Sequence, residues 1–141
     1  MNALNPYLNF NGNTEEAFNF YKSVFGGEFA SVMRFGDTEG CEGMPEAEKN
    51  GIMHIALPVG ENILMGTDIP KSMPQVTFGS NISLSMSVKS REEADRVFNA
   101  LSEGGEITMP MADMFWGDYY GMVTDKFSVQ WMVSYNEKSC I

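Results

Sequence analysis

The chain contains a single histidine, so any chemistry that needs an imidazole would have to depend on His54. This residue lies in the run Ile52-Met-His-Ile-Ala-Leu57, which predicts a strand. An imidazole titrates near neutral pH and can act as a general base or donate a hydrogen bond to a ligand. A Ser-His-Asp arrangement would depend wholly on this residue, and a His-rich zinc site is excluded. The competing interpretation is a structural histidine bonded to a neighbouring strand or loop.

Composition and charge restrict the kinds of molecule that this protein could bind. A formal charge of −10 argues against nucleic acid and anionic lipid, because both are polyanions bound mainly by Lys and Arg. No apolar run is long enough to span a bilayer, and the first residues do not resemble a secretory signal, so we expect a cytoplasmic protein without membrane contact. Cys41 and Cys140 are the only cysteines and are expected to be free thiols.

An internal repeat organises the chain. Residues 13–17 (Asn-Thr-Glu-Glu-Ala) resemble residues 90–94 (Ser-Arg-Glu-Glu-Ala), and each segment later closes with Gly-Gly-Glu. Each begins with a side chain that can cap a helix, followed three residues later by Glu16 or Glu93, the spacing of a capping box. Apolar residues then recur at helical spacing. We therefore predict two amphipathic helices, each ended by its glycine pair.

Strands are expected on both sides of each helix. The predicted strands are residues 5–10, 28–35, 51–58 and 62–67 in the first half, and residues 82–88, 105–109, 119–124 and 129–135 in the second. The order is βαβββ, twice, so we predict an α+β fold in a single domain, with repeats 1–67 and 80–141 and a linker at 68–79. The acidic, Gly-rich segment 36–51 has no counterpart in the second half and would be a lid or a surface excursion.

The doubled unit and a final Asp-x-Phe-x-x-x-Trp hairpin resemble the vicinal oxygen chelate superfamily, which contains glyoxalase I, extradiol dioxygenases, fosfomycin-resistance proteins and bleomycin-binding proteins. Within it the chain is similar to the PhnB-like branch, often labelled a demethylubiquinone methyltransferase domain. The residues that carry the likeness are Pro6-Tyr7-Leu8, Glu16-Ala17, Phe20-Tyr21, Phe25-Gly26-Gly27, Met53-His54, Leu64-Met65, Met114 to Gly121, Asp125, Phe127 and Trp131. The resemblance implies a glyoxalase-like curved sheet with helices on its outer face, and a homodimer. A methyltransferase activity finds no support, because no glycine-rich phosphate or adenosyl cradle occurs in the sequence.

The resemblance also indicates where metal-dependent members place four ligands, usually His, Gln or Glu, on the first and fourth strands of each repeat. Counting from the helix starts and through the final hairpin puts these positions at Pro6, Met65, Ser83 and Met132. A shift of one residue would bring in Tyr7, Leu64, Ile82 or Trp131. A proline, a serine and two thioethers cannot build a site for a divalent ion, and the shifted set adds only the phenol of Tyr7. We therefore predict no catalytic metal and no other cofactor.

Ligand sites are mostly apolar, with a few placed polar groups. By alternation His54 faces away from Met53, Ile55 and Leu57, which are expected to pack under a helix, so it would point into the cup formed by the sheet. The candidate ligand-binding residues on this face are Tyr7, Asn9, His54, Met65, Ser83, Ser85, Trp116, Tyr119, Tyr120 and Met132. Trp116 suits a rim or lid and an interface anchor equally.

Three functions remain open. The first is a metal-independent protein that binds a small molecule in a cavity of a homodimer, as metal-free bleomycin-binding relatives do. The second is a lyase or isomerase acting on a small oxygen-rich metabolite, with His54 as the catalytic base and Tyr7 or Asp118 assisting. The third is a dimeric interaction module without a ligand.

Overall fold

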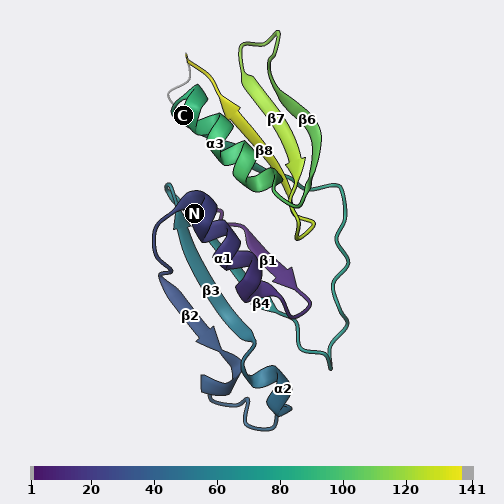
Figure 1. Cartoon of the computed structure of the whole chain (residues 1–141). Coiled ribbons are helices and arrows are strands. Elements are labelled where there is room, and N and C mark those ends of the chain that lie inside the picture. Colours follow the sequence, from purple (N-terminus) through teal and green to yellow (C-terminus); the bar gives the residue numbers. More distant parts are fainter. Residues whose placement is uncertain (1, 138–141) are drawn as a thin grey trace. The chain divides into compact units, whose positions relative to one another are not determined.

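Two four-stranded sheets, each with one long helix on one face, make up the computed structural model, which describes residues 2–137 (Figure 1). The sheets belong to two compact units, Met1–Thr77 and Phe78–Ile141. Cys41 is a free thiol, and Cys140 lies outside the described residues. None of the helices within residues 2–137 is long and apolar enough to cross a membrane.

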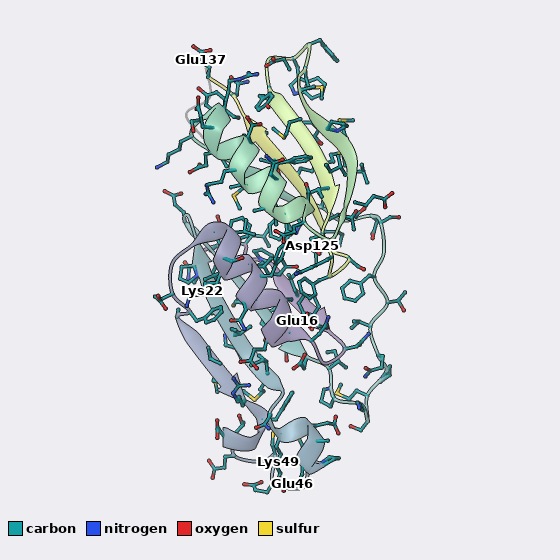
Figure 2. The ribbon with its side chains drawn as sticks, in the orientation of Figure 1. Glu16, Lys22, Glu46, Lys49, Asp125 and Glu137 are labelled. Carbon is teal, nitrogen blue, oxygen red and sulfur yellow. The ribbon has the colours of Figure 1, made fainter. Side chains whose placement is uncertain are left out.

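The first unit has the connectivity βαβββ, with two short helical turns inserted. Its elements are β1 (Tyr7–Phe10), α1 (Thr14–Phe25), β2 (Ser31–Arg34), η1 (Phe35–Asp37), α2 (Glu46–Lys49), β3 (Ile52–Val59) and β4 (Asn62–Asp68). The strand order is β1-β4-β3-β2, with β1 parallel to β4 and the other pairs antiparallel. The α2 turn carries an exposed Lys49–Glu46 ion pair, labelled in Figure 2.

The second unit repeats this connectivity without the insertion. Its elements are β5 (Leu84–Ser87), α3 (Arg91–Ser102), β6 (Glu106–Asp113), β7 (Tyr119–Thr124) and β8 (Gln130–Tyr135). The strand order is β5-β8-β7-β6, and β5 is parallel to β8. The predicted α+β fold of two tandem βαβββ repeats is therefore confirmed.

Each helix packs its apolar stripe on its own sheet. In the first unit the buried helix residues include Phe18 and Tyr21, which lie over buried strand residues such as Ile55. A Cβ added to Gly66 of β4 would lie 2.6 Å from Cε1 of Phe18, so only glycine lets the helix come this close. The sheet face that packs against the apolar side of the helix is therefore the face that forms the core.

The two helices begin differently. Ser90 accepts a hydrogen bond from the Glu93 N–H at 3.0 Å, and the Glu93 carboxylate accepts one from the Lys89 N–H at 3.1 Å, which confirms the predicted cap. Asn13 makes no side-chain capping bond, so the corresponding prediction for α1 is wrong. Its ψ of 26° departs from the extended backbone that an N-cap side chain needs, whereas Ser90 is extended.

Both first strands are shorter than expected. β1 begins at Tyr7 instead of residue 5, and β5 covers Leu84–Ser87 instead of 82–88. Each is an edge strand that pairs on one side only, and its partner strand is longer than it is. Before β1, the Asn5 side chain replaces a strand hydrogen bond: it accepts from the Ile63 N–H at 2.9 Å.

The segment 36–51 is attached to the first unit. The Phe35 N–H donates to the carbonyl of Gly51 at 3.1 Å, and the Lys71 N–H donates to the Glu48 carboxylate at 2.8 Å. β4 runs to Asp68, one residue past the expected end of the first repeat. The division into a single domain with a linker at 68–79 stays a prediction.

Candidate functional site

The sheet of the first unit has one face under α1 and one face free of it, which we call the helix-free face. Gly66 lies against Phe18 of α1, so its neighbours on β4 point the other way, and strand pairing extends this face across the sheet. Its strand residues are Tyr7, Asn9, Ser31, Met33, His54, Ala56, Pro58, Ile63, Met65 and Thr67. Four predicted ligand-binding residues, Tyr7, Asn9, His54 and Met65, therefore share one surface.

A hydrogen bond joins Tyr7 to His54 on the helix-free face. The Tyr7 hydroxyl lies 3.1 Å from Nδ1 of His54, and the two ring centroids are 5.8 Å apart. Because β4 lies between β1 and β3, this bond spans β4 beside Met65, which is paired with Tyr7. Partial burial raises the pKa of Tyr7 above its ordinary value. The phenol therefore keeps its proton at neutral pH.

The helix-free face carries no formal charge among its strand residues. Arg34, at the end of β2, instead makes a bidentate pair with Glu15 of α1 at 2.6 and 3.0 Å. This pair lowers the pKa of Glu15 and raises that of Arg34. Asp68 is buried on the α1 side, where it bonds Thr14. Besides Tyr7 and His54, the strand residues of this face thus offer thioethers, alkyl groups, hydroxyls and an amide, although the chain as a whole is strongly acidic.

The second unit has an equivalent face. Met132 of β8 pairs with Ser85 of β5 and with Met122 of β7. Strand pairing therefore places Tyr7 beside Met65 and Ser85 beside Met132, in place of Pro6 and Ser83, the positions counted from the helix starts. Ser83 precedes β5. The count from the helix starts does not follow this pairing, because the distance from strand to helix start differs between the repeats, and the ligand positions themselves stay a prediction.

Tyr119 and Tyr120 point to opposite faces of β7. The Tyr119 hydroxyl donates to Asp95 of α3, and the guanidinium carbon of Arg91 lies 3.9 Å from its ring centroid. The bond to Asp95 raises the pKa of Tyr119. The expectation that Tyr119 shares the face of Tyr120 is therefore wrong, because adjacent strand residues alternate.

Trp116 lies in the turn between β6 and β7 and is 51% exposed. Its Nε1–H donates to Asp118 at 2.9 Å, and the other carboxylate oxygen of Asp118 accepts from Asn136 at 2.6 Å. The indole ring also lies 5.9 Å from the ring of Tyr120, centroid to centroid. Trp116 is therefore a fixed, exposed aromatic residue outside the core, and its role as rim or anchor stays a prediction.

The donor set at the ligand positions of the superfamily does not fit a divalent metal. The predicted positions Pro6, Ser83, Met65 and Met132 offer one alcohol and two thioethers, and the residues paired with the two methionines, Tyr7 and Ser85, offer a phenol and an alcohol. Such groups are poor ligands for the divalent ions that His, Gln and Glu bind. Among residues 2–137 there is also no group of three or more His, Cys, Asp or Glu side chains that could hold a metal ion.

Metal analysis tests this directly. Untagged protein purified without chelator is expected to contain far less than one equivalent of Ni, Zn, Mn or Fe per chain, because the thioethers cannot replace the missing ligands. Elemental analysis by mass spectrometry measures this. Titration with each ion should also leave the melting temperature unchanged, since only binding to the folded state raises it. About one tightly held ion per chain would contradict the prediction.

The sequence alone missed the Tyr7–His54 bond and the separation of Tyr119 from Tyr120. The alternation of β7 was a signal for the second, because two consecutive strand residues cannot share a face. No local signal could have found the first, since Tyr7 and His54 are 47 residues apart.

Comparison with known proteins agrees with the fold. The family described as 3-demethylubiquinone-9 3-methyltransferase matches residues 2–134. Protein PA1353 from Pseudomonas aeruginosa is 41% identical, with a TM-score of 0.83, and the match covers 95% of this chain and 98% of that chain. The putative 3-demethylubiquinone-9 3-methyltransferase, PhnB protein, from Bacillus cereus is 27% identical, with a TM-score of 0.75 and coverage of 94% and 98%. Protein YjdN from Escherichia coli K12 is 30% identical over 93% of each chain.

More distant structures share the fold alone. A glyoxalase/bleomycin resistance protein from Albidiferax ferrireducens T118 is 14% identical, with a TM-score of 0.61 over 95% of this chain and 99% of that chain. The expected PhnB-like glyoxalase fold is therefore confirmed, while the function has to be argued from the site.

Proposed function

Since this chain belongs to the family described as 3-demethylubiquinone-9 3-methyltransferase, with a PhnB-like glyoxalase fold, we propose that it binds a small molecule without a metal ion and acts as a homodimer. The observation that carries the proposal is the Tyr7–His54 pair on the helix-free face of the first unit. It supplies directed polar groups on a surface that is otherwise uncharged and partly apolar, the composition expected of a ligand site.

The methyltransferase in the family's description is not part of this proposal. Doubly wound folds hold nucleotide cofactors at strand–loop–helix crossovers at the carboxyl ends of a parallel sheet. Both sheets here contain antiparallel neighbours, and only one pair in each is parallel. The residues present therefore do not fit such a cofactor.

The thioethers support binding of an apolar ligand body. Met33 is paired with His54 across β2 and β3 and is 42% exposed, and Met65 lies between β1 and β3. Flexible, polarisable side chains adapt to irregular ligand shapes. Ile63, on the same face, is 37% exposed. An apolar surface of this kind also suits contact with a second copy of the chain, as the homodimer requires.

A ligand screen tests the proposal. Wild-type protein is incubated with a metabolite extract, and bound compounds are recovered by ultrafiltration and identified by mass spectrometry. A ligand at about 100 times its Kd is expected to stabilise the folded state by about 2.7 kcal/mol, seen as a melting temperature several degrees higher. Tyr7→Phe should weaken this effect. Tyr119→Phe is the matched control, because it removes a hydroxyl on the α3 side.

Absence of any bound compound and of any stabilisation would instead favour an interaction module. Analytical ultracentrifugation tests the dimer separately, because the molar mass that it measures is twice that of one chain for a homodimer. Both results bear on the proposal, because the ligand and the dimer are independent parts of it.

The alternative function is a lyase or isomerase with His54 as the base, and the placement of this imidazole on the helix-free face, away from α1, favours it. The two functions differ in the fate of the ligand. A binding protein returns the recovered compound unchanged, whereas an enzyme converts it, and His54→Ala abolishes the conversion.

A further inference from the structure

The hydrogen bond between Tyr7 and His54 determines which ring nitrogen faces a ligand. In a neutral imidazole one nitrogen donates and the other accepts. Nδ1 of His54 lies 3.1 Å from the Tyr7 hydroxyl, and burial keeps that phenol protonated by raising its pKa. A phenol that donates to Nδ1 requires Nδ1 to be the acceptor. The ring proton of His54 then resides on Nε2.

The reverse arrangement is less favourable. If Nδ1–H donated to the Tyr7 oxygen, the hydroxyl proton would turn to solvent, because the Tyr7 side chain is 43% exposed and no other residue among 2–137 accepts it. A phenol, with an ordinary pKa of about 10, is also a far better proton donor than a neutral imidazole N–H, and the imidazole nitrogen is the better acceptor. The pairing of the stronger donor with the stronger acceptor therefore places the proton on Nε2.

The Nε2–H group has no partner in the described part of the chain. The ring of His54 makes one hydrogen bond there, to Tyr7. On the helix-free face the residues nearest to it in the strand pairing are Met33 on β2 and Met65 and Thr67 on β4. The hydroxyl of Thr67 donates to the carbonyl of Met53 at 2.7 Å. No carboxylate stands on this face to accept the Nε2 proton.

We propose that His54 is a hydrogen-bond donor to the ligand, and that the ligand carries a carbonyl or carboxylate oxygen on an apolar body. The oxygen accepts from Nε2–H, and the apolar body lies on the thioethers of Met33 and Met65. A cationic ligand is disfavoured, because the face offers no carboxylate to it. This inference rests on the proposed function, and it assigns His54 to binding instead of to base catalysis.

Nuclear magnetic resonance of the imidazole tests the tautomer. The chain has one histidine, so the ring nitrogens of untagged protein give one unambiguous set of long-range proton–nitrogen correlations. At a pH where the ring is neutral, Nε2 is expected to show the shift of a protonated nitrogen and Nδ1 that of an unprotonated one. Tyr7→Phe removes the hydrogen bond to Nδ1, so the proton should exchange between the two nitrogens and their two shifts should move toward a common average. Tyr119→Phe should leave both shifts unchanged. A proton on Nδ1 in the wild type overturns the inference.

Three small probes test the ligand class. Benzoate and acetophenone carry an acceptor oxygen on an apolar ring, whereas benzylammonium has the same ring with a cationic donor. The first two are expected to shift the His54 nitrogens and the labelled methyl groups of Met33 and Met65, and benzylammonium is not. Because a hydrogen bond to a charged group is worth about a tenfold change in Kd, His54→Ala should weaken benzoate about tenfold. Tyr119→Phe should change it less than twofold.

The outcomes separate this inference from the proposed function. Equal binding of benzylammonium, or unchanged benzoate affinity in His54→Ala, overturns the assigned ligand class and leaves the small-molecule function intact. No response to any of the three probes also overturns the ligand class. The small-molecule part of the proposed function falls if the metabolite screen recovers no ligand.

Discussion

Replacing Asp68 by alanine is expected to lower the free energy of unfolding of the first unit by about 3–5 kcal/mol. The carboxylate is buried and accepts three hydrogen bonds, from the N–H and the hydroxyl of Thr14 at 3.0 and 2.6 Å and from the N–H of Ile52 at 2.8 Å. It therefore caps α1 in place of Asn13 and joins the helix start to β3 and β4. Alanine leaves two buried N–H groups without an acceptor, which costs more than the lost bonds alone.

Urea denaturation followed by far-ultraviolet circular dichroism measures this loss. The matched control is Asp37→Ala, which removes an exposed carboxylate from the same unit and should leave the midpoint nearly unchanged. Because domains are stable by only about 5–15 kcal/mol, the Asp68 variant should lose a large part of its stability. Equal midpoints for the two variants would show that the carboxylate does not hold α1 to the sheet.

Asp125→Ala is expected to destabilise the second unit by a similar amount, about 3–5 kcal/mol. Asp125, labelled in Figure 2, follows β7 and is 3% exposed. Its carboxylate accepts from the N–H groups of Phe127 and Val129 at 2.8 and 3.0 Å, and from Nε1 of Trp131 at 2.8 Å. It thus closes the β7–β8 turn and fixes a core tryptophan, and its removal leaves three donors unsatisfied.

Tryptophan fluorescence reports this change, since Trp116 and Trp131 both belong to the second unit. Asp113→Ala is the control, because it removes a carboxylate whose ion pair with Arg91 is exposed and should matter little. Asp125→Asn keeps one acceptor oxygen and is expected to lie between the wild type and the alanine variant. A fluorescence midpoint for Asp125→Ala equal to that of Asp113→Ala would refute the prediction.

The sequence by itself determined the helices, the strands and their doubled order. These follow from local periods, in which apolar residues recur every three or four positions in α1 and α3 and alternate in strands such as β5. Alternation also determined that His54 faces away from the helix, and the cap at Ser90 followed from a spacing of three residues. Each of these depends only on neighbours along the chain.

Only the tertiary structure decided which distant residues meet. Tyr7 reaches His54 across β4, Asp68 caps α1 from the last residue of β4, and Ser85 stands beside Met132. All three depend on the register of strands that pair after long connections, and a shift of one residue would turn every side chain to the other face. Local patterns do not fix that register, because it is set by how the helix stripe and the sheet fill a common core.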